Sequence, residues 1–168
     1  MITLAVDAMG GDAGLAMTVP GAVDFLKQQS DVHLIMVGDE AAVRQALSSA
    51  GAPMDRITVC HAAQVVEMDE APQSALKNKK ESSMRIAINQ VKEGNAQAAV
   101  SAGNTGALMA TARFVLKTIP GIERPAIAKF LPSDSEHVTL ALDLGANVDC
   151  TPEQLVQFAI IGSELVHA

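Results

Sequence analysis

Short apolar runs alternate along the chain with amphipathic helical patterns. A short unbroken apolar run is typical of a strand that other elements cover on both faces. Such runs predict strands at residues 2–6, 32–37, 57–60, 98–101, 126–131 and 138–142. The alternation predicts an α/β fold of three layers, in which a mostly parallel sheet carries helices on both faces.

Capping residues predict where the helices begin and end. Helices are expected from Asp39 to Gly51, from Ser82 or Ser83 to Gly94, over 104–117, and from Thr151 onward. The last start is the clearest, because Thr151 can cap, Pro152 suits the first helical position, and Gln154 completes a capping box. Its expected inward stripe comprises Leu155, Phe158, Ala159, Gly162, Leu165 and Val166.

The chain has the length of one domain. Its 168 residues predict a single α/β domain over 1–168. The turn residues at 132–136 are expected to join the last two strands as a hairpin. The last helical pattern is still amphipathic at Val166, so we expect its apolar stripe to pack against chain beyond this sequence.

Composition narrows the class of protein. Hydrophobic residues make up 49% of the chain, which excludes a disordered segment, yet there is no Trp or Tyr and only four Phe. A core of small side chains requires closely spaced layers. Two cysteines without CxxC spacing, no signal-peptide pattern and no long apolar run predict a protein of the reducing cytoplasm.

The charge is unevenly distributed. The net charge of −7 argues against a nucleic-acid binder. The window 77–85, the basic window, has a net charge of +3, against −10 for the remainder of the chain. Its basic residues are Lys77, Lys79, Lys80 and Arg85. A solvated helix start explains such a run, and so does a docking patch for an acidic partner or a phosphate group.

Polar, glycine-rich loops follow three of the predicted strands. Ligands of open α/β sheets bind beyond the carboxyl ends of the strands, so these loops carry the candidate site. The candidates are Asp7, Gly10, Gly11 and Asp12 in the first loop, Ser101, Gly103, Asn104, Thr105 and Gly106 in the second, and Asp143, Gly145 and Asn147 in the third.

The second loop has the features of an anion site. Gly103 and Gly106 permit tight turns that present consecutive N–H groups, and a helix N-terminus near Asn104 adds positive potential. A plain capped turn is the alternative. In the first loop, Asp7 and Asp12 allow a metal, a positioning role or simple turn capping.

Other site templates are absent or weak. The chain has no Gly-x-Gly-x-x-Gly, no Gly-Lys pair and no His-Glu-x-x-His, so we expect neither a nucleotide cofactor nor a metal. Residues 99–103 approximate a nucleophile elbow, but Ala99 replaces its first glycine and the chain offers no clear histidine partner. A serine hydrolase is therefore disfavoured.

Four motifs and a fifth short segment together carry a family resemblance. They are DAMGGD at 7–12, KKESSM at 79–84, VSAGNTGALM at 100–109, LDLGANVD at 142–149 and GIERP at 121–125. In their order along the chain they closely resemble the PlsX family of phosphate acyltransferases. That family is about twice as long, so the chain resembles its amino-terminal half, and its fold is similar to isocitrate and isopropylmalate dehydrogenases and to phosphotransacetylase.

The resemblance implies acyl transfer from acyl-(acyl carrier protein) to inorganic phosphate in phospholipid synthesis, without a cofactor. It further implies the partner PlsY and a cytoplasmic location that extends to the inner face of the membrane through that partner. The exposed apolar stripe of the last helix and the faces of small residues favour a homodimer. A dehydrogenase relative and a non-catalytic ligand-binding module stay open as alternatives.

On this basis we expect residues 101–106 to bind phosphate, with Asn104 and Thr105 as side-chain donors. Asn147 and the amides near Gly145 are expected at the carbonyl oxygen or the phosphate. Asp7, Asp12 and Asp143 then orient donors or relay a proton. The basic window is expected to contact the acidic carrier protein or its phosphopantetheine phosphate.

Overall fold

The structure is a computed structural model that describes residues 1–133, 138–144, 147 and 149–167. The chain forms two compact units, unit 1 (Met1–Leu116) and unit 2 (Lys117–Ala168), which we describe separately.

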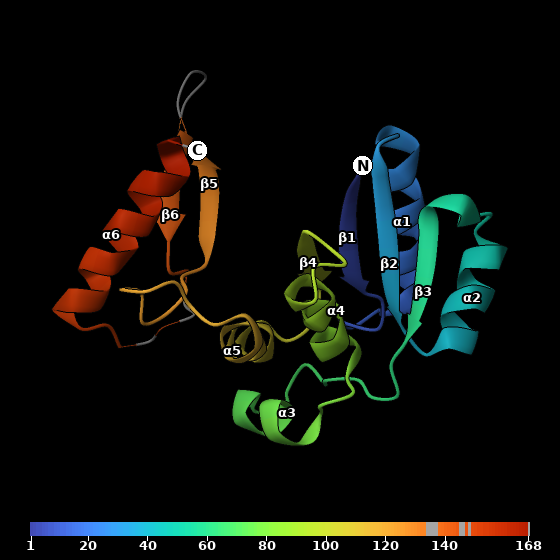
Figure 1. The fold of residues 1–168 in the computed structure, drawn as a ribbon, viewed down its shortest axis with the longest axis horizontal. Coiled ribbons are helices and arrows are strands. Elements are labelled where there is room, and N and C mark those ends of the chain that lie inside the picture. The colour runs from blue at the N-terminus through green and yellow to red at the C-terminus, as the bar shows by residue number, and fades with distance from the viewer. Residues whose placement is uncertain (134–137, 145–146, 148, 168) are drawn as a thin grey trace. The chain divides into compact units, whose positions relative to one another are not determined.

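Unit 1 contains the parallel sheet. Its elements are β1 (Ile2–Asp7), α1 (Leu15–Gln28), β2 (Val32–Gly38), α2 (Glu40–Ser49), a 3₁₀ turn (Met54–Arg56), β3 (Ile57–His61), α3 (Pro72–Asn78), α4 (Ser83–Lys92), β4 (Ala98–Ser101) and α5 (Thr105–Leu116) (Figure 1). The strands lie in the order β3-β2-β1-β4, and every neighbouring pair is parallel. The predicted strands and their parallel arrangement are confirmed.

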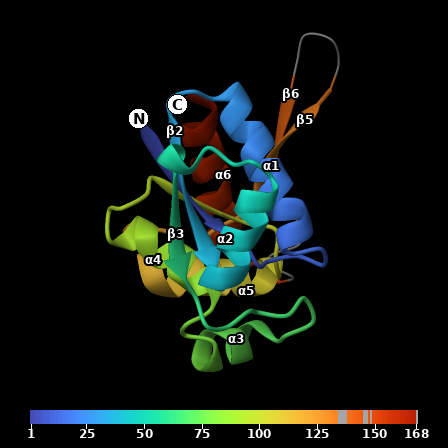
Figure 2. The same ribbon diagram turned by 90° about the vertical axis from the view of Figure 1, so that its right-hand side faces the viewer.

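Helices cover both faces of this sheet, as predicted. Alternate residues of β2 point to opposite sides: Leu34 and Met36 pack with α1 and α2, whereas Ile35 and Val37 pack with residues of α4. Figure 2 shows α2 and α1 on one side of the strands and α4 on the other. Burying a leucine or methionine side chain contributes about 1.5–3 kcal/mol, so each face contributes substantially to stability.

The face covered by α4 is built from small side chains. Ala5, Ala62, Ala87 and Ala96 form most of its buried cluster, and each is less than 5% exposed. Alanine leaves little distance between layers, so α4 approaches the sheet closely. A core of small side chains is what the composition, with no Trp or Tyr and only four Phe, predicts.

The predicted caps of unit 1 are confirmed. The Asp39 carboxylate accepts from the N–H of Ala42 at 2.8 Å at the start of α2. At the start of α4, Ser82 Oγ accepts from the N–H of Arg85 at 3.3 Å. Ser82 is therefore the cap of α4, and Ser83 is its first helical residue.

Two helices of unit 1 were not predicted, because their ends carry weak signals. Helix α1 contains Pro20 in its interior, and its cap position is Gly14, which has no side chain to accept a hydrogen bond. Helix α3 is short, and Ala71 occupies its cap position before Pro72. In both views α3 lies beyond the carboxyl ends of the strands (Figures 1 and 2).

Unit 2 consists of the antiparallel pair β5 (Ala128–Pro132) and β6 (Val138–Leu142), followed by α6 (Pro152–His167). The expected hairpin is confirmed by this pairing, while residues 134–137 of its connection lie outside the described residues. Gly162 brings α6 close to β6, because a Cβ at this position would lie 2.8 Å from Leu142 Cδ1.

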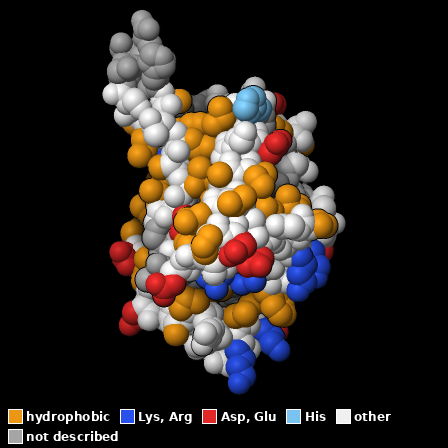
Figure 3. All heavy atoms as spheres, turned by 90° about the vertical axis from the view of Figure 1, so that its left-hand side faces the viewer, with side chains coloured by type: hydrophobic (Ala, Val, Ile, Leu, Met, Phe, Trp, Pro, Cys, Tyr) orange, Lys and Arg blue, Asp and Glu red, His pale blue; other side chains and the backbone are white. Residues whose placement is uncertain are grey.

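The capping box of α6 is confirmed, and its expected apolar stripe is buried only in part within this chain, so its packing against further chain stays a prediction. Thr151 Oγ1 accepts from the N–H of Gln154 at 3.3 Å, and Gln154 Oε1 accepts from the N–H of Thr151 at 3.2 Å. The buried residues of α6 are Gln154, Phe158 and Gly162, whereas Leu155, Leu165 and Val166 are exposed. Figure 3 shows hydrophobic side chains gathered over this face of α6.

Within the described residues, no helix is both long enough and apolar enough to cross a membrane.

Candidate functional site

The first and second candidate loops meet at the carboxyl ends of β1 and β4. Asp7 and Ser101 are register partners at the last position of this strand pair. Ser101 Oγ donates to Asp7 Oδ2 at 2.7 Å and accepts from the N–H of Gly103 at 3.1 Å. A relay of side chains therefore joins the end of β1 to the turn after β4.

The Asp7 carboxylate is buried and organises both loops. It is 1% exposed, and its Oδ1 accepts from the N–H groups of Gly10 at 3.1 Å and Met9 at 3.3 Å. Buried carboxylates are costly unless donors surround them, and these donors come from both loops. Asp12 is exposed. The geometry favours a positioning role for Asp7.

Glycine lets the two loops touch backbone to backbone. A Cβ at Gly10 would lie 2.6 Å from Asp7 Oδ2 and 3.0 Å from the nitrogen of Gly103. Gly11 has a φ of +89°, and a Cβ there would lie 3.0 Å from the carbonyl oxygen of Ala102. A side chain at either glycine would therefore push the two loops apart.

The Asn104 side chain is fully engaged with the protein. Its Nδ2 donates to the carbonyl oxygens of Met68 at 2.9 Å and Glu70 at 2.8 Å, with a longer contact to Glu67 at 3.3 Å. Its Oδ1 accepts from the N–H of Ala107 at 2.9 Å and thereby caps α5. Both ends of its amide therefore have partners within the protein. That Asn104 donates to phosphate stays a prediction.

The segment 67–72 contacts the second loop, which no sequence pattern indicated. The carbonyl groups of Glu67, Met68 and Glu70 hold Asn104, and a Cβ at Gly106 would lie 2.9 Å from Pro72 Cγ. Main-chain acceptors carry no residue-type signal, so a motif search does not find them.

The N-terminus of α5 provides the donors that a small anion needs. Thr105 is exposed and is the first residue of this helix, followed by Gly106. Asn104 accepts from the N–H groups of Ala107 and Leu108, while the described residues offer no acceptor to the N–H groups of Thr105 and Gly106. These two N–H groups, the Thr105 hydroxyl and the helix dipole favour phosphate or carboxylate.

The third candidate loop lies in unit 2 and has its own network. Asp143 Oδ1 accepts from Asn147 Nδ2 at 2.9 Å and from the Asn147 N–H at 3.1 Å, and Asn147 Nδ2 also donates to the Pro125 carbonyl at 3.2 Å. Gly145 lies outside the described residues. That this loop shares one crevice with the other two stays a prediction.

Cys150 belongs to the same network. Its thiol donates to Asp143 Oδ2 at 3.6 Å. Desolvation and this hydrogen bond to the Asp143 carboxylate raise the pKa of the Cys150 thiol. Desolvation, with Glu93 and Glu40 nearby, raises the pKa of Cys60 as well. Neither cysteine has the lowered pKa of an activated nucleophile.

The four basic residues of the predicted docking patch differ in accessibility. Lys77 and Lys80 are exposed. Lys79 is only 30% exposed and lies 4.0 Å from Glu70 Oε2. Arg85 is half-buried, with its guanidinium 5.1 Å from the centre of the Phe114 ring. The two exposed lysines are therefore the residues most accessible to an acidic partner.

Metal-ligating side chains do not gather in the part of the chain that the structure describes, where no group of three or more His, Cys, Asp or Glu could hold an ion.

Solved structures share the fold at low sequence identity. The chain aligns with a phosphotransacetylase from Streptococcus pyogenes with a TM-score of 0.68 at 19% identity, over 95% of this chain and 51% of that one. The EutD phosphotransacetylase from Staphylococcus aureus gives a TM-score of 0.64 with the same coverage. The predicted phosphotransacetylase-like α/β fold is confirmed.

Curated relatives are much closer in sequence. The chain is 83% identical over all 168 residues to a phosphate acyltransferase of Neisseria meningitidis serogroup A, and 69% identical over 166 residues to one of Chromobacterium violaceum. It spans about half the length of these relatives, 48% in both cases. The model of the fatty acid synthesis protein family matches residues 2–168, which confirms the predicted resemblance: the chain belongs to that family.

Proposed function

We propose that the full-length protein, meaning this chain with the other half that its relatives possess, transfers an acyl group from acyl-(acyl carrier protein) to inorganic phosphate. The observation that carries the proposal is 83% identity, over the whole chain, to a relative named phosphate acyltransferase. The anion-binding features at the N-terminus of α5 support it, because phosphate is the acceptor of this reaction.

The chemistry needs little beyond positioning. A phosphate oxygen attacks the thioester carbonyl carbon, and a tetrahedral oxyanion forms. The C–S bond then breaks, the thiolate leaves and takes up the proton that the phosphate gives up, and acyl phosphate is the second product. Holding the reactants together and stabilising the oxyanion supply the catalysis, without a covalent intermediate on the enzyme.

In this proposal the N–H groups of Thr105 and Gly106, with the Thr105 hydroxyl, bind phosphate. Asp7 and Ser101 hold the loops in place, aided by the close contacts of Gly10, Gly11 and Gly103. Asp143, Gly145 and Asn147 are retained for the carbonyl oxygen of the substrate.

The proposed partners follow from the same chemistry. Acyl carrier proteins are acidic, so the exposed Lys77 and Lys80 are the proposed contacts, together with the outer part of Arg85. Acyl phosphate is consumed by PlsY, and we propose a cytoplasmic homodimer that meets this partner at the membrane.

The test is a reaction of the full-length protein with acyl-(acyl carrier protein) in the presence and absence of phosphate. We expect release of the carrier thiol to require phosphate, with one acyl phosphate, trapped by hydroxylamine, for each thiol. For variants of the other lysines, Lys27→Met is a matched surface control, because Lys27 lies exposed on α1. Thiol release that is independent of phosphate, or binding of the carrier without turnover, would contradict the proposal.

A further inference from the structure

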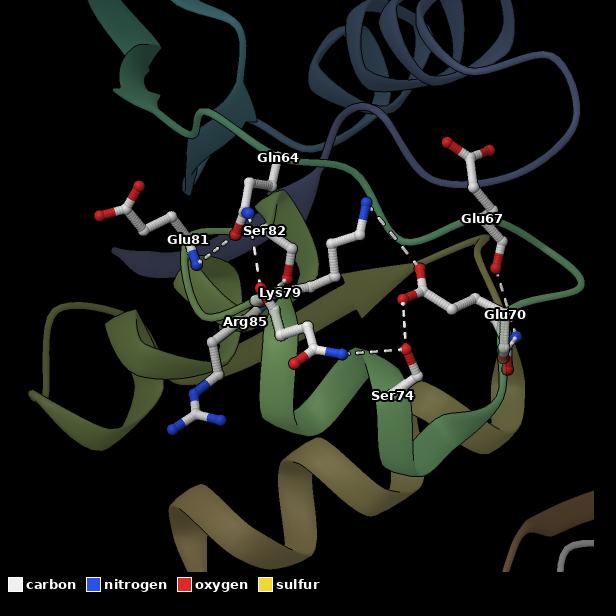
Figure 4. A network of polar contacts seen from close by, with 10 residues as sticks. Gln64, Glu67, Glu70, Ser74, Lys79, Glu81, Ser82 and Arg85 are labelled. Carbon is white, nitrogen blue, oxygen red and sulfur yellow. Dashed lines mark hydrogen bonds and ion pairs between the residues drawn. The ribbon is translucent and has the colours of Figure 1, made fainter.

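A chain of polar contacts joins the N-termini of α4 and α5 (Figure 4). Ser82, the cap of α4, donates from its Oγ to the carbonyl of Lys79 at 2.8 Å. The Lys79 ammonium points to the Glu70 carboxylate, and the Glu70 main-chain carbonyl accepts from Asn104 Nδ2 at 2.8 Å. Asn104 then caps α5 through Ala107. The basic window and the anion-binding helix are thus connected in space.

Glu70 is the unusual member of this chain. Its side chain is 15% exposed, and Oε1 accepts from Ser74 Oγ at 3.1 Å. Oε2 is buried and has no hydrogen-bond partner among the described residues. The Lys79 ammonium lies 4.0 Å from this oxygen. A buried carboxylate oxygen of this kind depends strongly on a nearby positive charge.

Lys79 is held where it can supply that charge. Its carbonyl accepts from both the N–H and the Oγ of Ser82. Gln64 braces the same segment, because its Oε1 accepts from the N–H of Glu81 at 3.1 Å. Figure 4 shows Lys79 directed toward Glu70, while Arg85 points away from the network. Lys79 therefore differs from its exposed neighbours Lys77 and Lys80.

We propose that Glu70 and Lys79 are positioning residues for the anion site at the N-terminus of α5. The pair fixes residues 67–70, where the carbonyls of Glu67, Met68 and Glu70 hold Asn104, and Asn104 sets the first turn of the helix. Loss of the Lys79 charge leaves the Glu70 carboxylate with only the Ser74 hydroxyl as a partner among the described residues. Residues 67–70 then shift and displace the N–H groups of Thr105 and Gly106. This inference rests on the proposed function and assigns Lys79 to the phosphate side of the reaction, not to the carrier.

Steady-state kinetics of full-length variants test this assignment. We expect Lys79→Met to raise the KM for phosphate about 10- to 100-fold, the cost of a small misplacement, with little change in the KM for the acyl donor. Lys80→Met should raise the KM for the acyl donor and leave the KM for phosphate unchanged. Lys27→Met should change neither KM. In the double variant Glu70→Gln/Lys79→Met, the phosphate KM should return to within about threefold of wild type, because a neutral amide needs no counter-charge.

The opposite split of Michaelis constants overturns the proposal. If Lys79→Met raises the KM for the acyl donor and leaves that for phosphate, Lys79 docks the carrier. If it changes neither constant, or if the double variant shows no recovery, the pair does not position the site.

Hydrogen exchange separates this inference from the proposed function, because it needs no turnover. In the full-length protein, the N–H of Ala107, which Asn104 holds, should exchange about tenfold faster in Lys79→Met than in wild type or Lys80→Met. Recovery is expected in the double variant. Unchanged exchange overturns the inference even if the enzyme is active, and faster exchange supports it even if the protein lacks acyltransferase activity. If Lys79→Met does not fold, Lys79→Gln, which also removes the charge, replaces it with the same expected result.

Discussion

Asp7 and Asp143 occupy equivalent places in the sequence pattern, but their carboxylates differ in burial and in hydrogen-bond partners. Each directly follows an apolar run that predicts a strand and precedes a glycine-containing loop, and each carboxylate accepts hydrogen bonds from that loop. Asp7 is 1% exposed and also binds Ser101, which lies 94 positions away. Among the described residues, the donors to the Asp143 carboxylate lie within seven positions of it.

The backbone differs as well. Asp143 has a φ of +59°, in the left-handed region, which costs a residue other than glycine about 1 kcal/mol. Asp7 does not have a positive φ. Asp7 therefore joins two strands and two loops, while Asp143 shapes one loop at some local cost. An aspartate after an apolar run thus makes a long-range tertiary contact in unit 1 and stabilises a local turn in unit 2.

The largest expected effect is at Asp7. Asp7→Ala should lower the free energy of unfolding of the full-length protein by about 3 kcal/mol, because the Ser101 hydroxyl and the Gly10 N–H lose a buried acceptor. Urea denaturation measures it, with the exposed Asp12→Ala as a control expected within about 0.5 kcal/mol of wild type. Equal effects of the two substitutions would remove the distinction.

Ser101→Ala sharpens the comparison by removing only the link between loops. We expect a loss of about 1–2 kcal/mol in the same measurement, since Asp7 Oδ2 and the Gly103 N–H each lose a partner while the contacts within the first loop remain. A loss as large as that of Asp7→Ala would mean that the serine contact carries the whole effect.

At Asp143 the choice of substitution should matter more than the loss of the carboxylate. Asp143→Gly and Asp143→Ala both remove the contacts to Asn147, but only glycine relieves the positive φ. We expect the glycine variant to be about 1 kcal/mol more stable than the alanine variant. Equal stability would show that the left-handed backbone costs nothing here.

The smallest expected effect is on the reactivity of Cys150. Asp143→Asn removes the negative charge that helps to raise the pKa of this thiol, so the pKa should fall and the thiolate fraction at pH 8 should rise. Alkylation by iodoacetamide, followed at Cys150 by mass spectrometry, should accelerate about two- to fivefold, with Cys60 as the internal reference. An unchanged ratio of the two rates would contradict the pairing of Cys150 with Asp143.

The regular parts of the fold were predictable because their signals are local. Strands buried on both faces appear as apolar runs, and the caps at Asp39 and Thr151 are side chains with a defined hydrogen-bonding role. Helix α1 was not predictable in this way: Pro20 normally argues against a helix interior, and here packing of Val19, Val23 and Leu26 outweighs that preference.

The site was predictable at the level of loops but not of side-chain roles. The pattern correctly indicated that residues near Asp7 and Ser101 come together, since parallel strands end at one edge. It could not show that Asn104 binds the carbonyls of Met68 and Glu70, nor that Lys79 faces Glu70. Those contacts depend on where α3 and its flanking loops pack, which no local pattern encodes.

The central claim is that the N-terminus of α5 binds phosphate through its backbone, and one substitution tests it most directly. Thr105→Pro removes the N–H of the first helical residue, a position where proline is well tolerated, and Thr105→Ala removes only the hydroxyl. We predict that Thr105→Pro raises the phosphate half-saturation of the full-length enzyme about 10- to 100-fold, the value of a hydrogen bond to a charged group. Thr105→Ala should raise it by a smaller factor. A Thr105→Pro enzyme with the phosphate half-saturation of Thr105→Ala would contradict the claim.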